Sequence, residues 1–169
     1  MMRTNRTIAI ALATLTLAGA AGAGAAQAAP AMASDTAPSA CRPANHIAKI
    51  TTAPSSSGHR HYRVTLTAPR GYEPCRLAGS PTDVRFSNHG SQIDISAGRY
   101  GDQKTTVLFG PGHPAHFDVQ VRNNGRAIPA TEMSFTLQAP DGEIPGTSVA
   151  QGSFTVAAGT LIGPIQSGA

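Results

Sequence analysis

Apolar and polar residues alternate with a period of two through much of the chain. In segments 62–67 and 115–122, every second residue is apolar and the residues between them are polar or charged. Because successive side chains of a β-strand point to opposite faces, this alternation predicts strands with one buried face. Shorter segments of the same character are 47–51, 84–86, 93–95, 105–109, 133–137 and 154–156. The pattern predicts about eight strands and no helix.

Turn-forming residues separate these segments. Asn124-Gly125 and Pro111-Gly112 lie between strand candidates, as does Asn88-His89-Gly90. Such residues adopt the backbone angles that hairpin turns need. Strands spaced by about ten residues with turns between them are typical of two packed antiparallel sheets. We therefore expect an all-β sandwich of seven to eight strands.

The first 28 residues have the order of a secretory signal. Arg3 and Arg6 give a positive start, segment 8–17 is apolar, and Ala26-Gln27-Ala28 is a cleavage site of the A-x-A type. A second candidate site is Ala31-Met32-Ala33. An uncleaved membrane anchor is the alternative, but the residues after Leu17 are mostly Ala and Gly, with little transfer free energy. We expect a secreted or cell-wall-associated protein without a membrane span after cleavage.

The rest of the chain divides into three parts. Residues 29–40 lack periodicity and bulky apolar residues, so they are expected to form a flexible leader. Residues 41–158 carry the strand pattern and are expected to form one domain. Residues 159–169 follow the last predicted strand and are expected to form a C-terminal tail.

Charge and aromatic content argue against nucleic acid as a ligand. Loss of Arg3 and Arg6 with the signal reduces 13 Lys and Arg to 11, against 9 Asp and Glu, a net charge of +2. The remaining arginines are scattered, whereas binding along a phosphate backbone needs several cations on one face. The chain has no Trp, and only 5% of its residues are aromatic, so stacking surfaces for bases or sugars are scarce.

The chain contains two cysteines, Cys41 and Cys75. Outside the cytoplasm, two lone cysteines are usually bonded to each other. We expect a Cys41–Cys75 disulfide that ties the start of the domain to the segment after residue 67.

Two short motifs follow each other in the middle of the chain. The first is a Cys-x-Leu-x-Gly-x-Pro segment formed by Cys75, Leu77, Gly79 and Pro81. The second is the turn 108–112, Leu-Phe-Gly-Pro-Gly, which introduces the next long strand. In this order they resemble an exported actinobacterial family known as domain of unknown function 4232. The resemblance covers residues 41–158 and implies an immunoglobulin-like sandwich outside the cytoplasm, with no established activity. Relatives carry a second cysteine pair in their C-terminal half, which this chain lacks.

Six histidines raise the question of a metal site. His59 and His61 are two residues apart at a strand start, which places both imidazoles on one face. His113 and His116, from another segment, are the candidates that would complete a zinc or copper site. The alternative reading is a polar loop, residues 55–61, that leads into a strand.

No local signature of an enzyme stands out. The chain lacks a Gly-x-Ser-x-Gly elbow and a His-Glu-x-x-His helix. Asp141 and Glu143 are the candidate ligands for calcium, although a solvated turn also accounts for them. We expect no enzymatic activity and no cofactor.

Three functions are compatible with these observations. The leading hypothesis is a β-sandwich that binds a protein or a cell-envelope component. The second is a small metal-binding protein built on His59, His61, His113 and His116. The third, a protease inhibitor, would use the loop at 72–75 or at 142–146.

Overall fold

The fold was analysed in a computed structural model that describes residues 37–56 and 58–169. The expected signal and most of the expected leader lie outside these residues. Within them, the chain forms β-strands and one 3-10 helix, η1 (Pro43–Asn45). The prediction of an all-β chain is confirmed.

The strands differ widely in length. The longer ones are β1 (Ile47–Ser56), β2 (His59–Thr67), β4 (Thr82–Asn88), β8 (Ala115–Arg122), β9 (Ile128–Thr136) and β12 (Ser148–Val156). The shorter ones are β3 (Cys75–Ala78), β5 (Ser91–Ile93), β6 (Gly98–Arg99), β7 (Thr106–Phe109), β10 (Gln138–Ala139), β11 (Gly142–Glu143), β13 (Leu161–Ile162) and β14 (Gln166–Ser167). Each of the eight segments predicted from alternation overlaps one of these strands.

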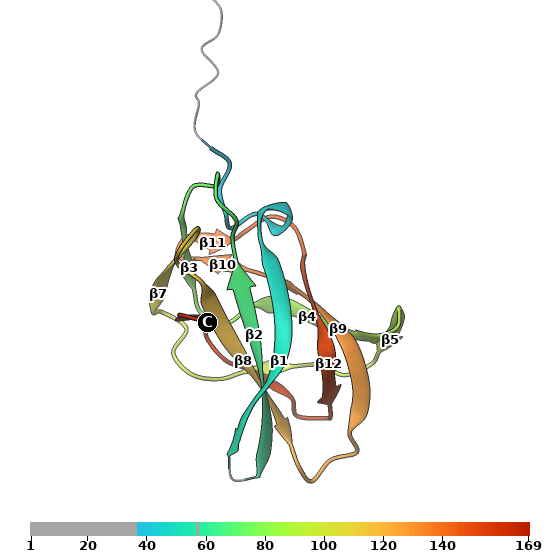
Figure 1. Cartoon of the computed structure of the whole chain (residues 1–169). Helices are drawn as coiled ribbons and strands as arrows, with labels where there is room; N and C mark the ends of the chain where they lie inside the picture. Colours follow the sequence, from blue (N-terminus) through green and yellow to red (C-terminus); the bar gives the residue numbers. More distant parts are fainter. Residues whose placement is uncertain (1–36, 57) are drawn as a thin grey trace, which may run out of the picture. The chain divides into compact units, whose positions relative to one another are not determined.

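Ten strands join in one mixed sheet. Nine follow the order β5-β4-β9-β12-β1-β2-β8-β13-β6, and β14 also pairs with β8. Most neighbours are antiparallel, but β1 pairs with β12, and β13 with β6, in parallel. Two further pairs, β3–β7 and β10–β11, stand apart from this sheet. The structure therefore differs from two separately paired antiparallel sheets, because β1 connects both halves of one sheet (Figure 1).

The two halves of the sheet face each other across the core. Phe117 of β8 packs edge-on against Phe135 of β9, with ring centroids 5.2 Å apart. Tyr62 of β2 meets Phe154 of β12 in the same way at 5.8 Å. Both contacts join strands from opposite halves. The largest fully buried side chains are Phe86, Phe109, Phe117, Phe135, Leu66, Leu77, Met133, Leu137, Ile162 and Ile165.

Residues 159–169 add two short strands to the sheet and three buried side chains to the core. β13 and β14 both pair with β8, and Thr160, Ile162 and Ile165 are buried. The segment between residues 158 and 169 lacks the alternation of a long strand because each of its strands has only two residues. It nevertheless belongs to the folded unit that extends to Ala169.

A close backbone approach marks the point where β1 leaves β12. The two strands pair at Ala48–Ala150 and Lys49–Gln151, and the pairing ends there. At the next position, Gly152, an added Cβ would lie 2.4 Å from the carbonyl oxygen of Ile50. A side chain at residue 152 would therefore push the two halves of the sheet apart.

We predict that Gly152→Ala lowers the free energy of unfolding by about 3 kcal/mol, because the backbone carbonyl cannot move out of the way as a flexible side chain would. Urea denaturation is the measurement. Gln151→Ala, at the exposed neighbouring position, is the control and should change stability by less than about 0.5 kcal/mol. A Gly152→Ala protein as stable as the control would contradict the proposed close approach.

A candidate binding groove at the disulfide

A disulfide between Cys41 and Cys75 fixes the segment that precedes β1. The two Cα atoms are 6.0 Å apart, and the residues are separated by 34 positions in the sequence. The predicted bond is confirmed. It links the residues before η1 to the first residue of β3.

Main-chain hydrogen bonds reinforce this link. The N–H of Ala40 donates to the carbonyl oxygen of Glu73 at 2.9 Å, and the N–H of Glu73 donates to that of Pro38 at 3.1 Å. Ala40 is fully buried. The last residues of the expected leader therefore lie beside residues 73–75 as part of the fold.

His46 connects the same segment to β12. Its Nδ1 lies 3.0 Å from the carbonyl oxygen of Ala40, and its Nε2 lies 3.1 Å from Oγ of Ser148. A carbonyl oxygen only accepts, so Nδ1 carries the proton, and Nε2 of the neutral ring accepts from the Ser148 hydroxyl. The ring also packs edge-on against Phe109. Burial lowers the pKa of His46, and hydrogen bonds to the backbone of Ala40 and Arg42 oppose this shift only in part.

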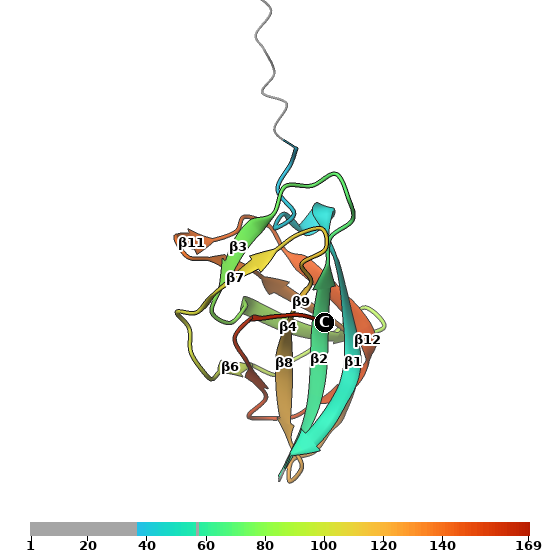
Figure 2. The same ribbon diagram turned by 60° about the vertical axis from the view of Figure 1, so that its left-hand side comes forward.

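An apolar groove of about 840 Å³ lies over the disulfide. Its apolar walls come from η1 and the residues around it, from the start of β3, and from the β10–β11 hairpin with the loop after it. The apolar residues and the disulfide in the lining are Cys41, Pro43, Ala44, Cys75, Ala139, Pro140, Ile144 and Pro145. Figures 1 and 2 show β3, β7 and β11 gathered at the end of the molecule opposite the turn between β1 and β2.

The walls of the groove are held in place by local contacts. The N–H of Ile144 donates to the carbonyl oxygen of Leu137 at 2.9 Å, which closes the β10–β11 hairpin. Gly146 approaches Pro43 so closely that an added Cβ would lie 3.1 Å from the proline ring. Three prolines in the lining have fixed φ angles, so little backbone freedom remains to be lost on binding. The groove is thus formed before any ligand arrives.

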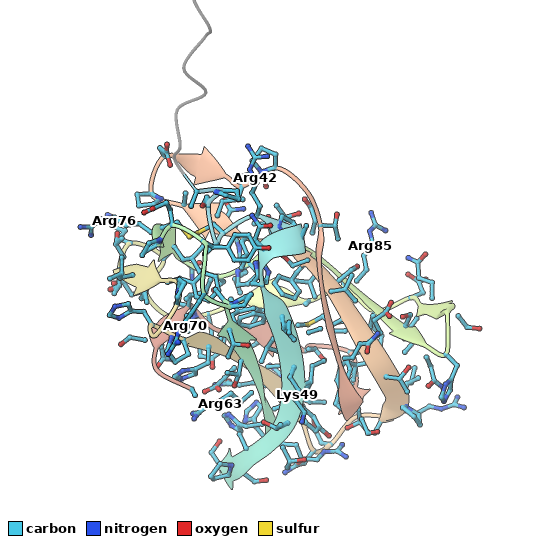
Figure 3. The ribbon with its side chains drawn as sticks, turned by 45° about the horizontal axis from the view of Figure 1, so that its top comes forward. Arg42, Lys49, Arg63, Arg70, Arg76 and Arg85 are labelled. Atoms are coloured by element: carbon cyan, nitrogen blue, oxygen red, sulfur yellow. A yellow bond between two sulfur atoms is a disulfide. The ribbon has the colours of Figure 1, made fainter. Side chains whose placement is uncertain are left out.

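Charged side chains lie at the rim of the groove. Arg42, Arg76 and Asp141 belong to its lining, and all three are exposed. Figure 3 shows Arg42 and Arg76 at this end of the molecule, away from Lys49 and Arg63. Within residues 37–56 and 58–169, the ion pair that forms is Arg63–Asp118, at 3.4 Å. Neither guanidinium at the rim is therefore neutralised by a carboxylate of the described chain.

The four histidines proposed as metal ligands do not come together, so the predicted four-histidine site is wrong. His61 lies opposite Gln120 in the β2–β8 ladder, whereas His116 lies opposite Thr65. Four residues of strand, about 13 Å, separate the two positions. His59 and His61 do lie side by side, with ring centroids 6.4 Å apart. The prediction that these two imidazoles lie on one face is therefore correct, but the register of β2 and β8 places His116 near the other end of their ladder.

Three of the candidate metal ligands, His61, His116 and Glu143, form hydrogen bonds with other residues of the chain. His61 contacts Oγ of Ser56 at 2.7 Å, and Nδ1 of His116 contacts the carbonyl oxygen of Gly168 at 3.0 Å. Glu143 accepts from the Thr82 hydroxyl at 3.0 Å and therefore belongs to a side-chain network. In the part of the chain that the structure describes, no three metal-ligating side chains form a cluster.

Comparison with known proteins identifies the family. Residues 41–160, well over half of the chain, match the family model described as Domain of unknown function (DUF4232). The chain belongs to this family. No curated protein and no solved structure matches it.

The Cys-x-Leu-x-Gly-x-Pro segment that begins at Cys75 has a structural role in this chain. Leu77 and Pro81 are buried, and Gly79 has a φ of +64°, where an added Cβ would lie 3.0 Å from the carbonyl oxygen of Gln103. The N–H of Ser80 donates to Oε1 of Gln103 at 2.8 Å, and Nε2 of Gln103 donates to Oγ of Ser80 at 3.0 Å. The motif thus fixes the loop before β7 against the end of β3.

Most of the groove was not visible in the sequence. Alternation does not mark Pro43, Pro140 and Pro145, and β10 and β11 have two residues each. The one usable signal was the Cys41–Cys75 pairing, which brings two walls of the groove together.

Among the described residues, the chain has no helix long and apolar enough to cross a membrane.

We predict that loss of the disulfide lowers the free energy of unfolding by about 3 to 4 kcal/mol, as expected for closure of a loop of this length. Thermal denaturation of Cys41→Ser, Cys75→Ser and the double variant should give the same loss for all three, because each removes the same bond. Free thiols titrating in the folded wild-type protein would count against the bond.

We predict that the protein loses stability as the pH falls from about 7.5 to about 5.5. The pKa of His46 is lowered in the folded state, so the unfolded state binds the proton more readily. The stability that neutral His46 contributes is therefore complete above the unfolded pKa, and it declines as the pH falls toward the folded pKa. Urea denaturation at both pH values should show a smaller decline for His46→Gln. The exposed-site variant His113→Gln should retain the wild-type decline; equal declines in all three proteins would refute the role of His46.

Proposed function

We propose that this DUF4232 domain is an exported, non-enzymatic module that binds a protein or a cell-envelope component through the groove at the disulfide. The observation that carries the proposal is an apolar groove whose rim bears two guanidiniums that form no ion pair with residues 37–56 and 58–169. Its volume is within the range of about 300 to 1,000 Å³ that is common for ligand sites. An apolar lining with a few charged groups at its edge is also the composition of such sites.

Binding fits the chemistry of the rim better than catalysis does. The guanidiniums of Arg42 and Arg76 present N–H donors and no acceptor. Both are effective donors to carboxylates. Asp141 is exposed to solvent at the same rim. We propose recognition, with no cofactor, as the role of this groove.

Two observations support export. The first 28 residues have the order of a secretory signal, and the Cys41–Cys75 bond is of a kind that persists in oxidising compartments. Secretion or attachment to the cell wall is therefore the location that we propose.

We also propose that the curled sheet is a variant of the immunoglobulin-like sandwich. The facing halves and the aromatic contacts between them support this relationship. In such scaffolds the segments at the ends of the strands carry binding residues, because changes there leave the core intact. The groove occupies such an end.

The proposal predicts that a carboxylate introduced into the groove weakens capture of the ligand. Immobilised mature protein would be incubated with the envelope fraction of the producing organism, and retained components would be quantified by mass spectrometry. Pro145→Asp and Ala44→Asp each place a carboxylate at an exposed position of the groove lining, in two segments that are distant in the sequence. Each should reduce recovery of the specifically retained component about tenfold.

The matched control is Val149→Asp, at an exposed apolar residue of β12 that is not part of the groove lining. It should retain wild-type capture. Thermal denaturation verifies that all variants are folded. Equal recovery with the wild type and both groove variants would reject the groove as the binding site.

A further inference from the structure

We propose that the ligand of the groove is an extended acidic peptide segment, whose apolar side chain enters the groove and whose carboxylates bind Arg42 and Arg76. This inference rests on the proposed binding function and specifies the partner. Three features of the groove support it: its charge, the start of β3 in its lining and the small number of backbone donors in its walls.

The charge of the lining favours an anionic partner. Two guanidiniums and one carboxylate, that of Asp141, belong to it. Neither Arg42 nor Arg76 forms an ion pair within the part of the chain that the structure describes. An unpaired guanidinium beside an apolar surface binds a carboxylate well, because it presents several N–H donors in one plane. A basic ligand would meet repulsion at the same two positions.

The start of β3 favours an extended peptide over a compact ligand. Among the described residues β3 is paired as a strand with β7 alone, β10 packs against it without joining the ladder, and Cys75 and Arg76, its first two residues, belong to the groove lining. In an antiparallel pair, alternate residues of an edge strand direct both N–H and C=O away from their partner. Such groups accept an added strand, and pockets beside the edge then select its side chains. Figure 2 shows β3 between β7 and the region of β11.

The lining also explains why side chains, rather than many main-chain contacts, must select the ligand. Pro43, Pro140 and Pro145 have no N–H to donate. The apolar walls therefore offer van der Waals contact but few hydrogen bonds. Specificity then depends on the edge of β3 and on the charge of the two arginines.

The test uses fluorescent peptides of about eight residues, the length of a strand that could lie along the groove. In the first peptide, Glu alternates with Leu and Phe. The second has Lys in place of every Glu, and the third has Ser in place of every Leu and Phe. Binding to the mature protein is measured by fluorescence polarisation. The first peptide should bind at least about tenfold more tightly than either of the others.

Charge variants of the protein identify the site. Arg42→Gln with Arg76→Gln should weaken binding of the first peptide about tenfold, and Asp141→Asn should strengthen it about twofold. The matched control is Lys49→Gln with Arg85→Gln, which removes two exposed cations outside the groove. This control should bind like the wild type. An increase from about 0.1 M to about 0.5 M salt should weaken binding of the acidic peptide.

Several results would overturn the inference. Equal binding of the Glu and Lys peptides, or unchanged binding by the Arg42→Gln, Arg76→Gln protein, would exclude an acidic peptide. Cosedimentation with phosphatidylglycerol vesicles that depends on both arginines, without peptide binding, would assign the groove to an anionic lipid instead. If the acidic peptide is excluded but Pro145→Asp loses capture of the envelope component, the proposed binding function is still supported. Capture that is unaffected by Pro145→Asp would reject that function itself.

Discussion

The short parallel contact between β1 and β12 is the constraint on which the rest of the structure depends. It involves only Ala48–Ala150 and Lys49–Gln151, yet it joins the four strands on the β12 side to the strands on the β2 side. Beyond these pairs, Gly152 has no side chain to collide with the backbone of Ile50, so β1 and β12 can diverge while their backbones remain close. The sheet curls there, and Tyr62 contacts Phe154. Across the core, the halves are held by the aromatic contacts and by a hydrogen bond of 2.8 Å between the hydroxyls of Tyr62 and Thr155.

The groove depends on the same strand. β1 begins at Ile47, directly after the segment that the disulfide and His46 hold against residues 73–75 and β12. The positions of Pro43 and Ala44 in one wall are thus set by the start of β1, and Cys75 in another wall is set by the disulfide. The third wall, the β10–β11 hairpin, follows β9 in the chain. The groove and the core share residues, since Cys41 belongs to the core and Cys75 and Ile144 pack against it.

The strands with an apolar face were predictable because their burial has a simple period. Tyr62, Val64 and Leu66 alternate as expected, and all three are buried. The two-residue strands were not predictable, since they are defined by partners such as β8 rather than by their own residues. The disulfide followed from the cysteine count, whereas the metal site failed because spacing fixes a face but not the register between His61 and His116. The groove needs contacts between three distant segments, and no local pattern encodes those.

The β10–β11 pair is hydrogen-bonded as its own two-stranded sheet, apart from the ten-stranded one. Insertions or deletions within residues 139–147 would therefore leave the register of every long strand unchanged, while they would reshape one side of the groove. Such a hairpin can diversify by mutation at little risk to folding. Descendants of one ancestral gene that differ in this hairpin would present different groove walls, with the sheet and the disulfide inherited intact.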